Sequence, residues 1–369
     1  MRTIKIDIKQ LNDIPAAHAY LKRRLGLPSY YGMNLDALYD CLSTMDEAQI
    51  VLTCAKDAQL TETAGRYVRV MRDAAADNRK LELSFDVLAQ EPRGRYRLIA
   101  LDIDGTAVRD DKSMDELTRD AIRQALRIGK EVIFCTGRPV AETRQYLKLF
   151  PDMRYLLCES GALLYDLHRK APVYRKCLAD ETVQALEQTA AGRDICPVAF
   201  IEGEYYIAQK QVDRLAHYRM GEFQEVVLQI AHTVDELFSY MKQHDLKADK
   251  INLFHTTPED RAVSRMILEE KGVPICMADG EISSLECTAP GVSKGLGLEK
   301  LSRETGISTA DMIVVGDADN DLVGLAAAGL AVAMGNASER VKNVCDVVVA
   351  DNEHCGCAEA ICRYLLGTY

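Results

Sequence analysis

The chain has 369 residues, of which 48% are hydrophobic and 27% charged, as is typical of a soluble globular protein, and this length predicts two or three domains. Its formal net charge of −11 argues against a protein that binds nucleic acid or an anionic membrane, because both attract basic surfaces. No apolar run approaches the ~20 residues that span a bilayer, and the N-terminus lacks the apolar stretch of a signal peptide, so we expect a cytoplasmic protein.

Residues 1–88 alternate predicted strands with predicted helices and form a small domain of their own. Three strands are predicted, over residues 4–8, 50–52 and 81–85. Three helices are predicted, over residues 16–25, 35–42, and from 61 or 63 to about 76. Asn34 is the expected N-cap of the second helix, because its side chain can accept a hydrogen bond from the first turn.

The segment LKRRLGLPSYYGMNLDALYDCL, residues 21–42, closely resembles the signature of barstar, the intracellular ribonuclease inhibitor. The resemblance extends over residues 1–88, with the elements in the same order. It implies a small α/β domain that binds a protein, and the partner that it implies is a basic ribonuclease.

The resemblance also implies a protein-binding face, whose candidate members are Asp36, Tyr39, Asp40, Asp73 and Asp77. Asp36 and Asp40 are spaced i, i+4 and share one helix face, and in this family such acids occupy the phosphate-binding site of the nuclease. Asp73 and Asp77 are each one methylene shorter than the glutamates of the family, and Tyr39 stands where barstar itself has an indole. An acidic face of this kind steers a basic nuclease. A solvated helix face, or a contact within the chain or between copies of it, are the alternatives.

A second domain begins after residues 89–97, AQEPRGRYR, whose composition is that of an exposed linker. The apolar run 98–101 predicts a buried strand, and Asp102 and Asp104 follow it directly. Residues i and i+2 of a strand point to the same side, at the end where open α/β sheets bind ligands. Two carboxylates this close need a cation or a shared proton. An ordinary Asp-Gly turn is the alternative for this motif taken alone.

Two more buried strands are predicted over residues 131–135 and 155–158, after a helix over 114–128 that Ser113 can cap. Thr136 and Gly137 follow the first of these strands and can offer a hydroxyl and a backbone N–H to an oxyanion. Taken alone, this sequence is more often an ordinary turn. The alternation of strands and helices predicts a mainly parallel sheet.

Residues 180–287 lack any comparably sharp motif, and they predict a second α+β module inserted into the first. Strand-like segments are found at 198–201, 205–208 and 248–253. Helical segments are found at 181–191, 209–217, 233–244 and 258–271.

The sheet domain resumes at PGVSKG, where Lys294 opens a helix at a position that faces anions. A solvated surface lysine is the commoner explanation of such a residue. A strand over 312–315 then leads into GDADND, which contains Asp317, Asp319 and Asp321. A calcium loop fits this run only in part, because the downstream glycine and glutamate are missing.

In this order, DxDGT, TGR, a helix-opening lysine and GDxxND resemble the haloacid dehalogenase-like superfamily of aspartate-nucleophile phosphohydrolases. ESGA, PGVSKG and MGNA narrow the resemblance to the Cof-type sugar-phosphatase branch. The resemblance implies an α/β fold with a Rossmann-like core over 98–179 and 288–369 and an inserted α/β cap for substrate specificity over 180–287.

The resemblance gives the two first aspartates different roles. Asp102 is the expected nucleophile, which attacks phosphorus to form an aspartyl-phosphate and so splits a difficult hydrolysis into two easier steps. Asp104 is expected to protonate the leaving oxygen and then to deprotonate the water that attacks the intermediate.

The other motif residues are expected to bind the phosphoryl group or Mg²⁺. The expected substrate-binding residues are Thr136, Gly137, Arg138, Lys294 and Asn320. The expected metal ligands are Asp102, the main-chain carbonyl of Asp104, Asp317 and Asp321. Mg²⁺ suits hard carboxylate oxygens and lets an anionic nucleophile approach an anionic substrate. Ser160 replaces an asparagine that is usual in this branch, which puts the family's specificity in doubt here but not its chemistry.

We therefore expect a Mg²⁺-dependent phosphatase for a small phosphorylated metabolite, a sugar phosphate or similar, fused to a barstar-like protein-binding domain. A phosphomutase is one alternative, because Asp104 and a large cap suit both reactions. The other alternative is a ribonuclease-inhibiting or binding protein with an accessory phosphatase domain.

Overall fold

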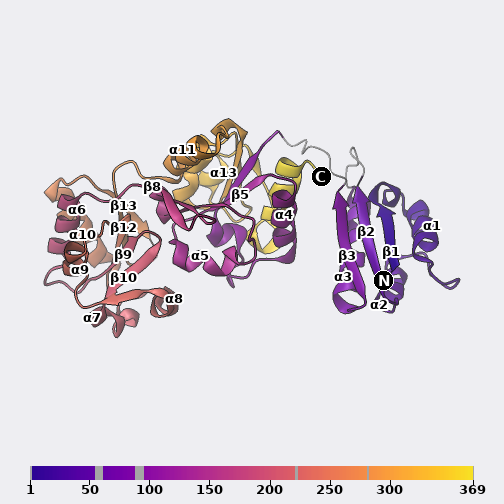
Figure 1. Cartoon of the computed structure of the whole chain (residues 1–369), viewed down its shortest axis with the longest axis horizontal. Helices are drawn as coiled ribbons and strands as arrows, with labels where there is room; N and C mark the ends of the chain where they lie inside the picture. Colours follow the sequence, from indigo (N-terminus) through magenta and orange to yellow (C-terminus); the bar gives the residue numbers. More distant parts are fainter. Residues whose placement is uncertain (1, 55–60, 88–94, 221–222, 281, 369) are drawn as a thin grey trace. The chain divides into compact units, whose positions relative to one another are not determined.

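The computed structural model describes the chain except for residues 1, 55–60, 88–94, 221–222, 281 and 369. The chain divides into two compact units, residues 94–365 and residues 1–93 together with 366–369. In Figure 1 the N-terminal unit runs from indigo to purple and the larger unit from purple to yellow. No helix among the described residues is both long and apolar enough to cross a lipid bilayer.

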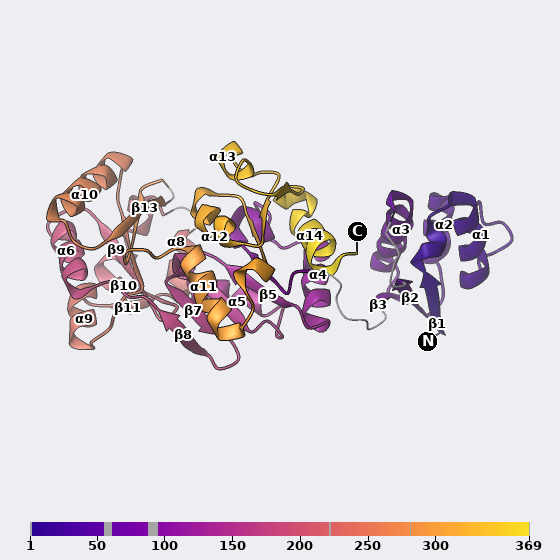
Figure 2. The same ribbon diagram turned by 90° about the horizontal axis from the view of Figure 1, so that it is seen from above.

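The N-terminal unit is a three-stranded parallel sheet with three helices. Its strands pair in the order β1 (Arg2–Asp7), β2 (Ala48–Cys54) and β3 (Leu81–Val87). Its helices are α1 (Ile14–Leu25), α2 (Leu35–Ser43) and α3 (Glu62–Asp77). Figure 2 shows the helices on one face of the sheet, and their inward side chains form a single core with the strands.

The predicted helices and strands of this unit are all present, with shifts at their ends. Asn34 caps α2, since its side chain accepts a hydrogen bond from the Ala37 N–H at 2.7 Å. Of the two candidate threonines, Thr61 caps α3. Ile8 lies outside β1, in a 3-10 turn, yet its side chain is buried. The apolar alternation at Ile8 therefore reflects burial and not strand pairing.

The core of the larger unit is an eight-stranded sheet in the order β17, β16, β15, β4, β5, β6, β7, β8. The first six strands of this order pair in parallel, which confirms the predicted sheet, and β7 and β8 add an antiparallel edge. The bounds of these strands are β4 (Leu98–Leu101), β5 (Glu131–Cys135), β6 (Tyr155–Cys158), β7 (Leu163–Asp166), β8 (Ala171–Arg175), β15 (Met312–Gly316), β16 (Leu330–Ala333) and β17 (Val347–Val348).

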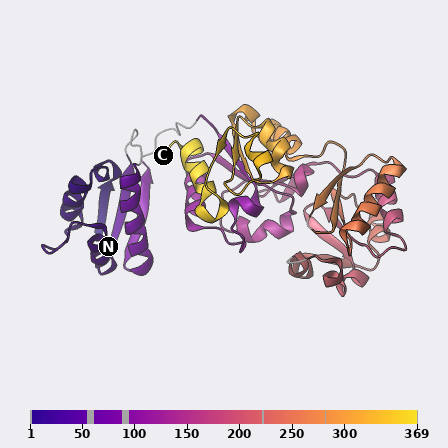
Figure 3. The same cartoon turned by 180° about the vertical axis from the view of Figure 1, so that it is seen from behind.

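Helices pack against this sheet and against each other. They are α4 (Glu116–Arg127), α5 (Val140–Leu147), α11 (Lys294–Thr305), α12 (Leu322–Ala327), α13 (Glu339–Lys342) and α14 (Gly356–Ala360). α11 packs against β6 and β7, α12 against β15 and β16, and α4 against β5 and α14. Figure 3 shows the yellow C-terminal helices against the core. Asp115, and not Ser113, caps α4, because its side chain reaches the Thr118 N–H at 2.9 Å.

A second sheet, of six strands, follows β8 in the chain, in the order β11, β10, β9, β12, β14, β13. Its strands are β9 (Cys196–Ile201), β10 (Glu204–Ala208), β11 (His232–Val234), β12 (Lys250–Phe254), β13 (Cys276–Gly280) and β14 (Ser284–Thr288). Its helices are α6 (Asp180–Ala190), α7 (Gln209–Val212), α8 (Phe223–Ile230), α9 (Leu237–Gln243) and α10 (Pro258–Lys271). We call this region, from α6 to β14, the cap module.

The cap module departs from the sequence prediction in places. The helix expected from residue 233 begins at Leu237, because residues 232–234 form the short strand β11. The strand β14 and its edge partner β13 were not predicted. β13 is mostly exposed and lacks apolar alternation, so its sequence carries no strand pattern.

Candidate active site

A cavity of about 440 Å³ lies where residues after β4 and β5 face the cap module. β4 lies between β5 and β15 in the core sheet, so the segments that follow these three parallel strands meet at one edge. Six of the side chains or backbone positions expected from the sequence line the cavity: Asp102, Asp104, Thr136, Gly137, Arg138 and Asn320.

Lys294 connects two of the predicted acids. It is the first residue of α11, and its Nζ lies 2.6 Å from Asp102 Oδ1 and 2.5 Å from Asp321 Oδ1. Burial raises the pKa of the Asp102 carboxyl to about 7, although Lys294 opposes the shift. Burial alone would lower the pKa of Lys294, but the two carboxylates outweigh it and the pKa lies above its ordinary value. Lys294 is therefore a permanent cation beside Asp102.

Asp102, Asp317 and Asp321 each present a carboxylate oxygen within 4.8 Å of the other two. Asp321 Oδ2 accepts a hydrogen bond from the Asp317 N–H at 3.0 Å, and Asp317 Oδ1 accepts one from the Thr106 hydroxyl at 2.7 Å. Gly105 has a φ of +70°, and a Cβ there would lie 2.5 Å from Asp317 Oδ2, so this position requires glycine. Burial raises the pKa of Asp317 to about 6. Three oxygen donors this close form a set that suits one hard cation.

Asp104 lies among different cations. Its carboxylate accepts two hydrogen bonds from Arg138, one of them from Nε at 2.6 Å, and one from Lys112 Nζ at 3.1 Å. Burial alone would raise the pKa of Asp104, but Arg138 and Lys112 outweigh it and the pKa lies below its ordinary value. Arg138 also pairs with Glu142 at 2.8 Å. The sequence predicted neither Lys112 nor Glu142, and the predicted contact of Arg138 with phosphate stays a prediction.

Thr136 and Gly137 lie at the end of β5, as expected from their position after an apolar strand. The Thr136 hydroxyl oxygen accepts a hydrogen bond from the Arg138 N–H at 3.2 Å, which leaves the O–H to donate. Ser160 lies nearby, because a Cβ on Gly137 would be 3.5 Å from its Oγ. Asn320 is exposed at the cavity.

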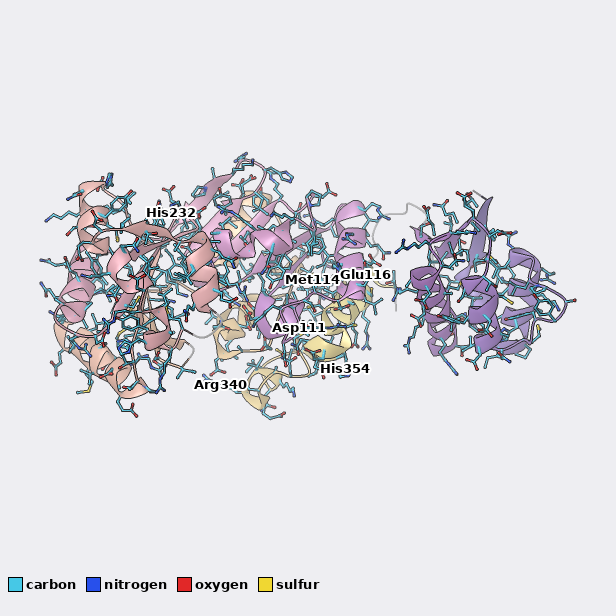
Figure 4. The ribbon with its side chains drawn as sticks, turned by 90° about the horizontal axis from the view of Figure 1, so that it is seen from below. Asp111, Met114, Glu116, His232, Arg340 and His354 are labelled. Carbon is cyan, nitrogen blue, oxygen red and sulfur yellow. The ribbon has the colours of Figure 1, made fainter. Side chains whose placement is uncertain are left out.

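Only two of the three acids in GDADND belong to the carboxylate cluster. Asp319 pairs instead with Arg340 Nη1 at 2.7 Å, and both side chains are more than half exposed, at 59% and 70%. Figure 4 labels Arg340 on the short helix α13. The position of Asp319 between two acids of the cluster in the sequence therefore does not bring it into the site.

The cap module adds cavity residues that the sequence analysis did not identify. They are Phe200, Tyr205, Val226, Lys250, Asn252, Phe254, Ser284 and Glu286. A signal for two of them was present: Lys250 and Asn252 alternate with apolar residues in β12, a strand that is buried along its whole length. A buried polar side chain needs a partner, so this alternation could have marked a polar site.

The acids predicted for the barstar-like face lie on two adjoining helices of the N-terminal unit. Asp36 and Asp40 are exposed on α2, and Asp73 and Asp77 are exposed on α3. The Tyr39 hydroxyl donates a hydrogen bond to Asp77 Oδ2, which joins the two helices through this face.

Comparison with known proteins gives two family matches, one in each part of the chain. Residues 99–361 match the family model described as haloacid dehalogenase-like hydrolase, and residues 1–90 match the model described as barstar (barnase inhibitor). The putative phosphatase YxeH of Bacillus subtilis is 28% identical over 280 residues, which cover 73% of this chain and 99% of that protein. The 5-amino-6-(5-phospho-D-ribitylamino)uracil phosphatase YcsE of the same organism is 25% identical over 272 residues, which cover 73% and 96%.

The core and the cap module also resemble solved structures. The crystal structure of a haloacid dehalogenase-like hydrolase from Bacteroides thetaiotaomicron matches with a TM-score of 0.62 at 23% identity. The match covers 73% of this chain and 99% of that one. The likeness supports the α/β fold of the larger unit.

Proposed function

The chain belongs to the family of haloacid dehalogenase-like hydrolases, and from this premise we propose that it is a Mg²⁺-dependent phosphatase acting on the phosphate monoester of a small metabolite. The observation that carries the proposal is the cluster of Asp102, Asp317 and Asp321 at the end of the core sheet, in which Asp102 and Asp321 are buried and Asp317 is partly buried. Both curated relatives described above are named phosphatases, which agrees with it.

Asp102 is the nucleophile in this proposal. Lys294 holds one of its oxygens at 2.6 Å, so the carboxylate keeps a fixed orientation at the cavity. Attack of the carboxylate on phosphorus breaks the bond to the leaving oxygen and forms an aspartyl-phosphate. The Thr136 hydroxyl and the Gly137 N–H donate hydrogen bonds to the phosphoryl oxygens, whose charge Lys294 also offsets.

Asp104 transfers the protons. Arg138 and Lys112 keep its carboxylate ionised before the substrate binds, which suits the second step, where Asp104 takes a proton from the attacking water. In the first step Asp104 must carry a proton for the leaving oxygen. A substrate that draws Arg138 or Lys112 away raises the pKa of Asp104 and favours that protonated form.

The carboxylate cluster fits Mg²⁺, because its donors are all oxygen atoms and lie within 4.8 Å of one another. Asp102, Asp317, Asp321 and the main-chain carbonyl of Asp104 would hold the ion. When bound, Mg²⁺ supplies positive charge that lets the Asp102 carboxylate approach an anionic phosphate. Asn320, exposed at the cavity, is assigned to the phosphate group.

Hydrolysis of para-nitrophenyl phosphate by the full-length chain tests this proposal. We expect turnover with Mg²⁺, loss of turnover on chelation, and recovery when Mg²⁺ is restored. Release of inorganic phosphate distinguishes hydrolysis from the phosphomutase alternative, in which the phosphoryl group is recovered on a second hydroxyl. Absence of turnover in the folded, Mg²⁺-loaded protein would refute the proposal.

For the N-terminal unit we propose a protein-binding role. The supporting observations are the match of residues 1–90 to the barstar model and the exposed acids on α2 and α3. Closely spaced carboxylates attract a basic protein surface at a distance, so binding should weaken as salt increases. A ribonuclease inhibitor with an accessory phosphatase is the alternative reading of the whole chain.

Capture of a basic ribonuclease by the full-length chain tests this second role. We expect Asp36→Ala and Asp40→Ala to weaken capture, each by about tenfold or more. Glu82→Ala is the matched control, because it removes one exposed carboxylate from β3, outside the predicted face. Retention of no basic ribonuclease by the unmodified chain, or equal losses in all three variants, would contradict the role.

A further inference from the structure

Contacts with two carboxylates fix the guanidinium group of Arg138. Its Nε donates a hydrogen bond to Asp104 Oδ2 at 2.6 Å, and its Nη2 donates one to Asp104 Oδ1. The remaining nitrogen, Nη1, lies 2.8 Å from Glu142 Oε1. A guanidinium group is planar, so contacts on two of its edges determine the orientation of the whole plane. Arg138 therefore holds the Asp104 carboxylate in a position that depends on its own contact with Glu142.

Glu142 is held on its other oxygen by a residue of the cap module. The Tyr205 hydroxyl donates a hydrogen bond to Glu142 Oε2. Both residues are buried, since the Glu142 side chain is 8% exposed and Tyr205 is 1% exposed. Arg138 and Tyr205 thus contact different oxygens of the Glu142 carboxylate. A buried acceptor that loses its donor is costly, so without the Tyr205 hydroxyl we expect Glu142 to move.

The turn between β9 and β10 brings Tyr205 to this place. The Ala141 N–H, in the first turn of α5, donates a hydrogen bond to the Gly203 carbonyl oxygen at 2.9 Å. Gly203 has a φ of +88°, and a Cβ there would lie 2.5 Å from Val140 Cγ2, so the turn lies directly against α5. The Tyr205 ring packs edge-on against Phe200, with ring centroids 4.7 Å apart. The Tyr205 hydroxyl therefore projects from a closely packed support.

A chain of contacts leads from the cap module through Glu142 and Arg138 to Asp104, and these three residues and Tyr205 all line the cavity. Asp104 is the proposed donor of the proton to the leaving oxygen. Such a transfer requires a donor within hydrogen-bond reach of that oxygen. A displacement of about 1 Å can lower a rate by about a hundredfold. Residues that take no part in the reaction can therefore influence it by fixing the place of Asp104.

We propose that Glu142 and Tyr205 are positioning residues for proton delivery. They orient Arg138, which in turn orients the Asp104 carboxylate toward the leaving oxygen. The inference rests on the proposed phosphatase function, in which the proton of Asp104 passes to the ester oxygen as the bond from that oxygen to phosphorus breaks. Through Tyr205, the cap module influences this first step without contact with the reacting atoms.

Two esters that differ in their need for a proton test the proposal on the full-length chain with Mg²⁺. The para-nitrophenolate anion leaves readily without a proton, whereas the more basic phenolate of phenyl phosphate depends more on protonation. The two esters otherwise share the same ring, and kcat/KM includes the step in which the leaving group departs. The ratio of kcat/KM for the two esters therefore measures proton delivery, and it does not depend on the fraction of folded protein.

Tyr205→Phe and Glu142→Gln should each lower kcat/KM for phenyl phosphate by at least about tenfold more than for para-nitrophenyl phosphate. Tyr205→Phe keeps the ring beside Phe200 and removes only the hydroxyl. Because both residues act through one chain of contacts, the double variant should change the ratio by no more than the larger single change. Glu204→Gln is the matched control, because it weakens an ion pair with Arg144 between the same two elements, β10 and α5, and should leave the ratio unchanged.

The outcomes separate this inference from the function on which it rests. Equal losses for the two esters in Tyr205→Phe and Glu142→Gln would overturn the inference and leave the phosphatase function standing, and so would an equally large shift of the ratio in Glu204→Gln. Turnover of para-nitrophenyl phosphate but not of phenyl phosphate by the unmodified chain would also overturn it, because there would be no proton delivery to position. Absence of turnover of both esters would overturn both proposals.

Discussion

The two units of the chain hold their acidic side chains under opposite conditions. In the larger unit, the Asp321 and Lys294 side chains are each 1% exposed, and they contact one another. In the N-terminal unit, Asp36, Asp40 and their neighbours on α3 are exposed to water. A buried carboxylate costs several kcal/mol unless a cation or donors compensate it, whereas an exposed one costs almost nothing.

This difference decides how much each cluster says about function. Lys294, Thr106 and backbone N–H groups hold the acids of this cluster, so their arrangement demands an explanation, and chemistry on an anionic substrate provides one. The exposed acids need no such support. Their grouping gains meaning from the match to barstar, and less from their geometry.

The largest predicted effect separates a buried acid of the larger unit from an exposed one. Asp102→Asn removes the proposed nucleophile and should lower kcat for para-nitrophenyl phosphate by at least about 10⁴-fold. Asp319→Asn, by contrast, changes an exposed acid paired with Arg340 and should keep turnover within about twofold of the unmodified chain. Steady-state kinetics at saturating Mg²⁺ measures both. Similar losses in the two variants would mean that burial does not mark the reacting acids.

The next effect concerns stability. Lys294→Met leaves Asp102 and Asp321 without their shared cation and should lower the free energy of unfolding by about 3–5 kcal/mol. Lys210→Met, which breaks an exposed ion pair with Glu236, is the control and should change it little. Urea unfolding without metal measures the difference. We also expect Mg²⁺ to stabilise Lys294→Met more than the unmodified chain, and equal stabilities of the two variants would contradict the account.

A pH dependence is expected from Glu159, which is completely buried. Burial, followed by the charge of Asp249, raises the pKa of this carboxyl well above its ordinary value, although Lys250 and Arg175 oppose the shift. The folded chain therefore retains a proton that the unfolded chain loses as pH rises above 4.5, and stability falls with rising pH.

The variant Glu159→Gln carries no titrating proton at this position, so its free energy of unfolding should fall less steeply with pH, by up to about 1.4 kcal/mol per pH unit. Glu339→Gln, at an exposed position of α13, is the control and should keep the slope of the unmodified chain. Unfolding curves between pH 5 and pH 8 measure the slopes. An unchanged slope in Glu159→Gln would show that Glu159 is ionised when buried.

The smallest effect belongs to the N-terminal unit. Tyr39→Phe removes an exposed hydrogen bond to Asp77 and should shift the unfolding temperature by no more than about 2 °C. If the face binds protein, the same variant should nevertheless weaken capture of a basic ribonuclease. A large loss of stability would instead show that Tyr39 is a structural link between α2 and α3.

The sequence predicted the central strands of the larger unit and the cap of α2, because local residue patterns determine both. The apolar run at 98–101 forms the central strand β4, and parallel neighbours bring the segments after β5 and β15 beside it. Asn34 caps α2 because a capping side chain acts only on the next few residues. Features that depend only on neighbouring residues can therefore be predicted from the sequence.

Other features depend on contacts between distant segments, which no local pattern encodes. Asp102 and Asp104 are two residues apart, yet the first is held by Lys294 and the second by Arg138 and Lys112. β4 ends at Leu101, so the chain has already turned when it reaches Asp104. The polar cavity side chains of the cap module escaped prediction because pairing of β12 with β14 brings them together across the intervening residues 255–283.

The most direct test of the central claim is to identify where the phosphoryl group is held during turnover. The full-length chain, with Mg²⁺ and excess para-nitrophenyl phosphate, is quenched in acid within milliseconds, digested, and analysed by mass spectrometry. The account predicts a phosphoryl group on the peptide that contains Asp102, removed by hydroxylamine and absent from Asp102→Asn. A phosphoryl group on another residue, or the same signal in Asp102→Asn, would contradict it.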